Sequence, residues 1–307
     1  DILKEVDKTR VARFQKAKSL ALKEYYENVM GNSNQWCVIS VPTQAWAKRV
    51  FPELSTEVAI SEMWKLILKI VRVDKENPIL EWENHLNTLK ARMDYLNKKR
   101  FAKLIYRNSL GTNLEIGLPE GHKWISGGEK SKAGVEFVAN IPTEEIFTMP
   151  HREKVNGVVV SSKPLIYGGS VIDKFTLTFK DGEVINYSAE VGEEILGKLL
   201  SMDENSKYLG EVALVEYDSP ISKSERVFYN TLFDENASCH LAFGGAYPVC
   251  LENSEGQSEE ELKERGMNNS LTHEDFMIGT EDMEIVGIDS EGRETTIMKN
   301  GNFVFTL

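Results

Sequence analysis

The chain has 307 residues, enough for one large domain or two smaller ones with a buried core. Hydrophobic residues make up 41% and charged residues 27% of the sequence, as in ordinary globular proteins. The formal net charge of −12 argues against a nucleic-acid partner, which would favour a basic protein face. No apolar run approaches the roughly 20 residues that span a bilayer, so no membrane partner is predicted.

The three cysteines, Cys37, Cys239 and Cys250, are an odd number and show no C-x-x-C spacing. This argues against a disulfide framework or a structural zinc site and favours a reducing, cytoplasmic location. The chain opens at Asp1, without a methionine and directly in a helical pattern. We therefore expect that an amino-terminal segment is missing.

The first hundred residues predict mainly helices. Residues 1–31 form one long amphipathic pattern, and residues 56–73 and 78–98 show helical apolar spacing. Asn77 can cap the last of these helices, because the proline that follows it is tolerated in a first helical turn. The short apolar run at residues 36–41 predicts a buried strand.

From residue 101 the pattern changes to strands with interspersed helices. A helix is expected at 193–202, and Asp181-Gly182 predicts a hairpin turn because glycine accepts a positive φ. The polar stretch 252–265 predicts a loop with a short helix. Strands are predicted at 102–106, 113–117, 136–139, 158–161, 171–179, 183–188, 211–217 and, as a meander, within 276–305. The predicted fold class is α+β, with a mixed, largely antiparallel sheet and flanking helices.

Two of the five histidines lie among acidic residues in the last third of the chain. His273 and Asp275 form an H-x-D pair, whose side chains share one face of an extended segment. With His240 they offer nitrogen and oxygen ligands that suit zinc, cobalt or manganese. Glu211 begins an apolar strand, where a buried carboxylate is costly unless it is paired or bound to a metal.

Ordinary structural roles compete with this metal-site hypothesis. A single histidine is more often a surface or hydrogen-bonded core residue, and Glu211 could lie at a solvent-exposed strand edge. The sequence has no G-x-S-x-G, P-loop, G-x-G-x-x-G or H-E-x-x-H motif, which excludes several common enzyme classes. Cys239 and His240 are adjacent, so their side chains point apart and do not predict a thiol protease.

Several co-linear stretches resemble the thermophilic aminopeptidase family of metallopeptidases, the group of aminopeptidases T, S and II. The resemblance runs from near the first helix to the end of the chain. The matching stretches are W-A-K-R-V-F-P (46–52), N-I-P-T-E-E-I-F-T (140–148), L-G-E-V-A-L-V (209–215), L-F-D-E-N-A (232–237) and H-E-D-F-M-I-G (273–279).

The resemblance implies a broad-specificity aminopeptidase that acts on peptides with two divalent metal ions. Zinc or cobalt is expected foremost, with magnesium or manganese as alternatives. It implies Glu216 as the general base and Tyr247 as a ligand or an oxyanion donor, and His151 is a further candidate to line the site. Its metal ligands fall on Glu145, Glu211, His240, Tyr247, His273 and Asp275.

The resemblance also implies a homodimer and an amino-terminal α/β lobe before the present chain. We expect residues 1–100 to be a helical connection to that lobe and residues 101–307 to be the metal-binding catalytic domain. Two other functions remain open from the residues alone. One is a different metal-dependent amidohydrolase or dipeptidase, and the other is a non-catalytic metal- or peptide-binding module.

Overall fold

The computed structural model describes residues 6, 10, 13–14, 17–18, 21–30 and 32–305. Its contacts divide the chain into two compact units, residues 1–40 with 128–141, and residues 41–127 with 142–307. The predicted division at residue 100 stays a prediction. None of the helices in the described part of the chain combines the length and apolar character of a membrane span.

The smaller unit contains one described helix and one hairpin. Helix α2 (Lys23–Met30) lies at the end of the predicted helix 1–31, about half of which falls outside the described residues. Strands β4 (Glu129–Lys130) and β5 (Glu136–Phe137) pair with each other. The predicted buried strand at residues 36–41 is wrong: Val38 forms only an isolated bridge to Asn140, and Ile39 is 63% exposed. Trp36 packs against Phe137, but among the described residues no strand covers the rest of this run.

The helices of the larger unit begin where the sequence supplies caps. The Asn77 side chain accepts a hydrogen bond from Leu80 N, 3.2 Å away, and so caps α5 as predicted. Ser55 caps α4 in the same way through Val58 N. The helices are α3 (Gln44–Val50), α4 (Thr56–Ile70), α5 (Pro78–Lys99), α6 (Glu193–Leu200), α7 (Thr231–Asp234) and α8 (Glu259–Glu264), with 3-10 turns η1 (Ser222–Ser224), η2 (Glu235–Ala237) and η3 (Pro248–Cys250).

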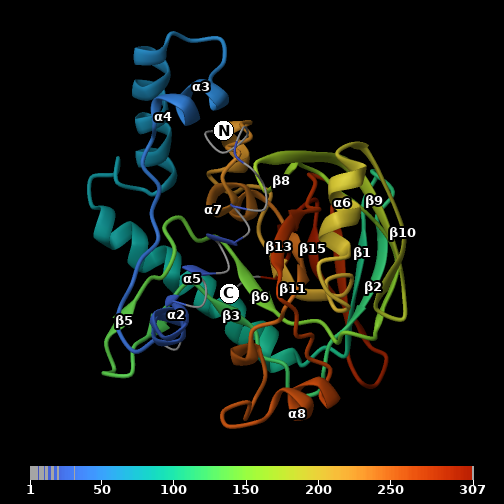
Figure 1. Ribbon diagram of the computed structural model, residues 1–307. Coiled ribbons are helices and arrows are strands. Elements are labelled where there is room, and N and C mark those ends of the chain that lie inside the picture. The colour runs from blue at the N-terminus through green and yellow to red at the C-terminus, as the bar shows by residue number, and fades with distance from the viewer. Residues whose placement is uncertain are drawn as a thin grey trace. The chain divides into compact units, whose positions relative to one another are not determined.

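Two antiparallel sheets build the larger unit (Figure 1). The large sheet has the strand order β10-β9-β7-β2-β1-β14-β15-β16, with β8 paired to β9, and the second sheet has the order β13-β12-β11-β6-β3. The strands are β1 (Lys103–Arg107), β2 (Asn113–Gly117), β3 (Ile125–Ser126), β6 (Ile146–Thr148), β7 (Val155–Val160), β8 (Leu165–Tyr167), β9 (Ser170–Lys180), β10 (Glu183–Val191), β11 (Leu209–Leu214), β12 (His240–Gly244), β13 (His273–Met277), β14 (Glu284–Ile288), β15 (Glu294–Lys299) and β16 (Asn302–Phe303).

One hydrophobic core joins both sheets and two helices. It includes Leu104 and Phe175 from the large sheet, Phe243 and Phe276 from the second sheet, and Leu89 from α5. The rings of Phe243 and Phe276 stack with their centroids 4.4 Å apart. Helix α6 packs against β9 and β10, as Figure 1 shows, and α5 packs against β3 and β6. The second sheet is therefore supported from several sides, and the predicted α+β class is confirmed.

The turn between β9 and β10 tests how much a close backbone contact adds to the cost of replacing a glycine. Gly182 has φ +85°, and a Cβ there would lie 1.6 Å from Arg152 O, whereas Gly292 has φ +81° and open space around it. Gly292→Ala should cost about 1 kcal/mol through backbone strain alone. Gly182→Ala should cost about 3 kcal/mol or more, because the backbone must also move. Chemical denaturation of both variants measures this difference, and equal losses would contradict it.

Candidate metal centre

The second sheet brings five of the sequence-predicted site residues to one place. His240, Ala242 and Gly244 alternate along β12 and so lie on one face of the sheet. Glu211 on β11 and Asp275 on β13 both pair with Ala242, from opposite sides. Two further cross-strand pairs extend this face, Ala213 with His240 and Gly244 with His273. The small side chain of Ala242 leaves room between the two carboxylates.

Glu145 reaches the same face from the next strand. It directly precedes β6, in which Phe147 pairs with Ala213 of β11. Because Glu145 lies two residues before Phe147, an extended backbone places both side chains on the face that carries His240. Its Oε2 lies 3.1 Å from His240 Nε2.

These residues form two groups that share one carboxylate. Glu145, Glu211 and His240 form the first group, and Glu211, His273 and Asp275 form the second, with ligand atoms within 4.8 Å of one another in each. Glu211 Oε1 lies 3.5 Å from His240 Nε2, while its Oε2 lies 3.6 Å from His273 Nε2. The two oxygens of Glu211 thus face different groups, which is how a carboxylate bridges two ions.

Backbone carbonyls orient both histidine rings. His240 Nδ1 lies 3.2 Å from Ser238 O, and His273 Nδ1 lies 2.7 Å from Gly245 O. A carbonyl oxygen only accepts, so each Nδ1 carries the proton and donates it. These Nδ1 bonds are an outer-shell arrangement common in metal sites. Each Nε2 points into the cluster, where the neighbouring carboxylates favour its protonated form without metal, and a bound cation would replace that proton.

The electrostatics of the cluster fit a cation. Burial, together with the charges of Asp275 and Glu145, raises the pKa of Glu211 to about 7 against the opposing hydrogen bond to His240. Burial alone would lower the pKa of His273, yet its contacts with Asp275 and Glu211 raise it to about 9. The buried Oδ1 of Asp275 makes no hydrogen bond. Carboxylates gathered in this way require either protons or metal ions.

Tyr247 and Glu235 surround the two groups. The Tyr247 ring lies 4.7 Å from the His273 ring, and burial plus the negative charges of Glu211 and Asp275 raise the pKa of its phenol. Glu235 lies on η2, which packs against β13. Burial and the charges of Asp275 and other cluster carboxylates hold the pKa of Glu235 well above its ordinary value. The sequence patterns did not single out Glu235, although it lies within the family-like stretch 232–237.

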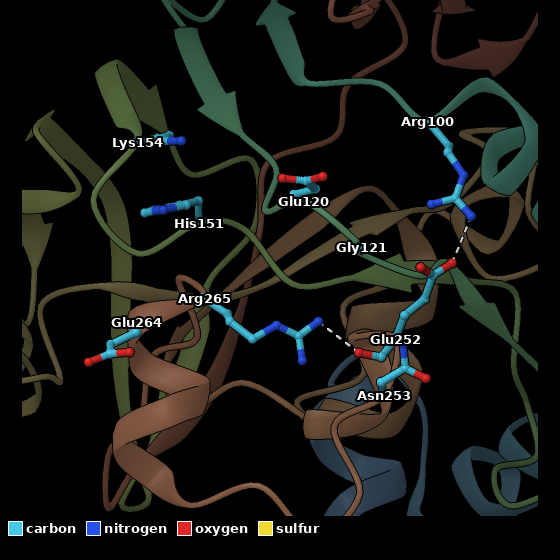
Figure 2. Close-up of a pocket in the computed structure, with 9 residues that line it drawn as sticks. All are labelled: Arg100, Glu120, Gly121, His151, Lys154, Glu252, Asn253, Glu264 and Arg265. Atoms are coloured by element: carbon cyan, nitrogen blue, oxygen red, sulfur yellow. Dashed lines mark hydrogen bonds and ion pairs between the residues drawn. The ribbon is translucent and has the colours of Figure 1, made fainter.

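Two other candidates lie apart from these groups. Glu216, two residues beyond the end of β11, forms an ion pair of 2.8 Å with Arg92 of α5. His151 lines a charged pocket with Arg100, Glu120 and Arg265, and none of the six predicted ligands lines that pocket (Figure 2). The structure therefore brings neither side chain into the two groups of the candidate centre.

Two adjacent groups of nitrogen and oxygen ligands around a shared carboxylate fit the metal centre of a metal-dependent hydrolase. Comparison with known proteins supports this class. A family model described as thermophilic metalloprotease (M29) matches residues 1–303. The chain belongs to this family, so it is a metalloprotease that uses divalent metal and acts on peptides.

Several relatives are similar over almost the whole chain. Aminopeptidase 2 of Geobacillus stearothermophilus is 49% identical over 307 residues, which cover 100% of this chain and 74% of that protein. Aminopeptidase AmpS of Bacillus subtilis (strain 168) is 48% identical, covering 99% and 74%. The solved structure of wild-type AmpT from Thermus thermophilus superposes with a TM-score of 0.92 at 40% identity, covering 99% of this chain and 73% of that one.

The shared position of Glu211 predicts the metal content of variants. Wild-type protein should bind about two ions per chain, as two-metal hydrolases do. Glu211→Ala should lose both ions, and His273→Ala should lose one. Glu274→Gln should keep both, because Glu274 alternates to the other face of β13. Elemental mass spectrometry after dialysis measures this, with circular dichroism as the folding control. Two retained ions in Glu211→Ala would contradict the arrangement.

Proposed function

We propose that this chain hydrolyses the amino-terminal peptide bond of peptides with two divalent ions held by Glu145, Glu211, His240, His273 and Asp275. The observation that carries the proposal is Glu211, whose two carboxylate oxygens face separate ligand groups. The names of the relatives, which are aminopeptidases, support release of the first residue rather than internal cleavage.

The charge of the site favours a free amino terminus. Glu145, Glu211, Asp275 and Glu235 bring four negative charges when ionised, and all four contribute to the raised pKa of Tyr247. Two divalent ions balance these charges, and one hydroxide leaves the site negative by about one unit. A protonated terminal amine therefore meets favourable electrostatics there, whereas an internal peptide segment brings no such charge.

Glu235 and Tyr247, which lie beside the ligand groups, have different chemical roles in the proposed reaction. Held by these residues, two divalent ions would supply carbonyl polarisation and a more acidic attacking water. Glu235 takes the proton of the attacking water and returns it to the nitrogen of the leaving amine. The Tyr247 hydroxyl either donates a hydrogen bond to the developing oxyanion or completes the ligand set. In the metal-free site, burial and the neighbouring carboxylates raise the pKa of its phenol, which favours the donating form.

Glu216 remains the alternative base, as the sequence predicts. Its ion pair with Arg92 occupies the carboxylate, and the side chain is 28% exposed. The surroundings of Glu235 are more suitable, because its charge interacts with Asp275, Glu145, His240 and Glu211. We therefore assign proton transfer to Glu235 first and to Glu216 second.

Further properties complete the proposal. The mixed nitrogen and oxygen ligands favour zinc or cobalt over magnesium or manganese. The three cysteines are free thiols, as expected for a cytoplasmic protein. A homodimer, which the family resemblance implies, is part of the proposal, and Trp64 and Leu68, exposed one turn apart on α4, are a candidate contact. The two alternatives, another amidohydrolase and a binding module, have no support from the relatives' names.

Metal removal tests the activity. Purified protein should release the amino-terminal residue from leucine anilide and from short peptides. A chelator should abolish release, and added zinc or cobalt should restore it. An amino-terminally acetylated peptide is the control and should not be cleaved, because it lacks the ammonium group. Cleavage of the acetylated peptide at the same rate would point instead to the amidohydrolase alternative.

Two isosteric variants test which glutamate is the general base. Glu235→Gln should keep both metals and lower kcat by about 100-fold or more, the usual contribution of a general base. Glu216→Gln should keep most of the activity, because the Glu216 carboxylate is engaged by Arg92 instead of the ligand groups. Steady-state kinetics with metal analysis measures both. The reverse pattern, with only Glu216→Gln inactive, would assign the base to Glu216.

A further inference from the structure

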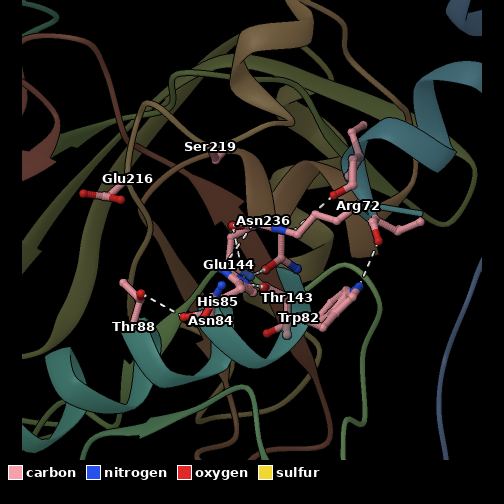
Figure 3. A network of polar contacts seen from close by, with 12 residues as sticks. Arg72, Trp82, Asn84, His85, Thr88, Thr143, Glu144, Glu216, Ser219 and Asn236 are labelled. Atoms are coloured by element: carbon pink, nitrogen blue, oxygen red, sulfur yellow. Dashed lines mark hydrogen bonds and ion pairs between the residues drawn. The ribbon is translucent and has the colours of Figure 1, made fainter. Parts of the chain in front are cut away.

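A buried polar network adjoins the segment that carries Glu145 (Figure 3). Arg72, between α4 and α5, donates from Nη1 to Glu144 Oε1 at 2.7 Å and from Nη2 to Glu144 Oε2 at 3.0 Å. These two parallel bonds form a bidentate pair, which fixes orientation as well as charge. The two side chains are only 13% and 8% exposed. Glu144 immediately precedes the candidate ligand Glu145.

The imidazole of His85 holds the adjoining backbone. Its Nε2 lies 2.7 Å from Thr143 O, and its Nδ1 lies 3.2 Å from Arg72 Nη2. The carbonyl can only accept and the guanidinium can only donate, so His85 is neutral with its proton on Nε2. Burial lowers the pKa of His85, which is consistent with this form. The ring therefore connects α5 to the backbone on one side of Glu144.

Asn236 holds the other side. Its Oδ1 accepts from Glu144 N at 2.7 Å, and its Nδ2 donates to Leu232 O at 2.9 Å. Asn236 is fully buried and follows Glu235 on η2. The same residue thus links the segment that carries Glu145 to the turn that carries Glu235.

The two neighbouring glutamates have opposite surroundings. Glu144 points to Arg72, while the Glu145 carboxylate lies 3.1 Å from His240 Nε2. Three contacts restrain Glu144 and Thr143, and strand pairing of β6 with β11 restrains the residue after Glu145. Since Glu145 lies between these restraints, its backbone position is determined from both directions.

From these contacts we infer that the Arg72–Glu144 pair, with His85 and Asn236, is a positioning network for metal binding by Glu145. This inference rests on the ligand set proposed above and adds residues that belong to neither ligand group. If the network only stabilised the packing of the helices against the second sheet, its loss would lower the stability of the fold. Loss of a positioning network instead lowers the affinity for one ion.

A double variant without the two charges distinguishes positioning of Glu145 from stabilisation of the fold. Arg72→Met/Glu144→Met removes both charges and approximately keeps the volume, a replacement that often leaves stability unchanged or higher. The control is Arg226→Met/Glu53→Met, which removes a more exposed arginine–glutamate pair with a 2.8 Å contact and includes none of the proposed ligands. Arg72→Lys is the second variant, since it keeps the charge but cannot form the two parallel bonds.

The measurements are zinc affinity by chelator competition and thermal unfolding of the metal-free protein. We expect the Arg72→Met/Glu144→Met variant to bind one of two zinc ions about tenfold more weakly, as outer-shell changes do, with a smaller effect on the other ion. Arg72→Lys should give an intermediate loss, and the control pair should bind both ions like the wild type. Unchanged zinc affinity in both Arg72 variants would overturn the inference.

Glu145→Gln distinguishes this inference from the proposed function. If Glu145→Gln loses one zinc ion while the Arg72 variants lose none, the ligand assignment stands and the positioning role is wrong. If Glu145→Gln binds two zinc ions like the wild type, the ligand assignment itself fails, and the positioning role fails with it. Neither comparison depends on catalytic activity.

Discussion

The structure of the candidate centre depends on one constraint, a carboxylate buried in the middle of an antiparallel sheet. Glu211 lies on β11 between β6 and β12, where both neighbouring strands exclude water from its side. A charged group in such a position is stable only with compensating charges close by. The histidines on β12 and β13 lie within 3.6 Å of its oxygens, and divalent cations held there, as proposed above, would provide this compensation. The backbone pairing of the sheet therefore determines which side chains meet.

The support of the site comes from outside the sheet. Asn236 and His85 reach the segment before β6 from η2 and α5, and Arg72 reaches it from the connection between α4 and α5. The helical part of the larger unit is therefore more than a cover for the core. Its polar side chains form hydrogen bonds with Thr143 and Glu144, which directly precede the candidate ligand Glu145.

The sequence allowed prediction of the features that depend on local patterns. The helices at α4 and α5, the Asn77 cap and the Asp181-Gly182 hairpin follow from periodicity and turn chemistry, which act over a few residues. The shared face of His273 and Asp275 follows from strand alternation. The strand that carries His240 was not predicted, because its apolar run is short and follows a polar, irregular segment.

Features that depend on tertiary contacts were beyond the sequence patterns. The apolar run at 36–41 resembles a strand, but burial requires a partner that periodicity does not reveal. Glu235 and Glu144 look like ordinary surface glutamates until the fold brings them to the cluster and to Arg72. The family resemblance supplied the six ligand positions, whereas spacing alone supported only His273 with Asp275.

A carboxylate that serves two ions also couples their binding thermodynamically. A cation beside one oxygen of Glu211 would remove part of the repulsion from Asp275 and Glu145, whereas a second cation nearby would be repelled by the first. By linkage, whatever factor one cation imposes on the affinity for a second, the second imposes on the first. The two ligand groups are therefore not independent binding sites, and the balance of these two opposing effects sets the sign of their coupling.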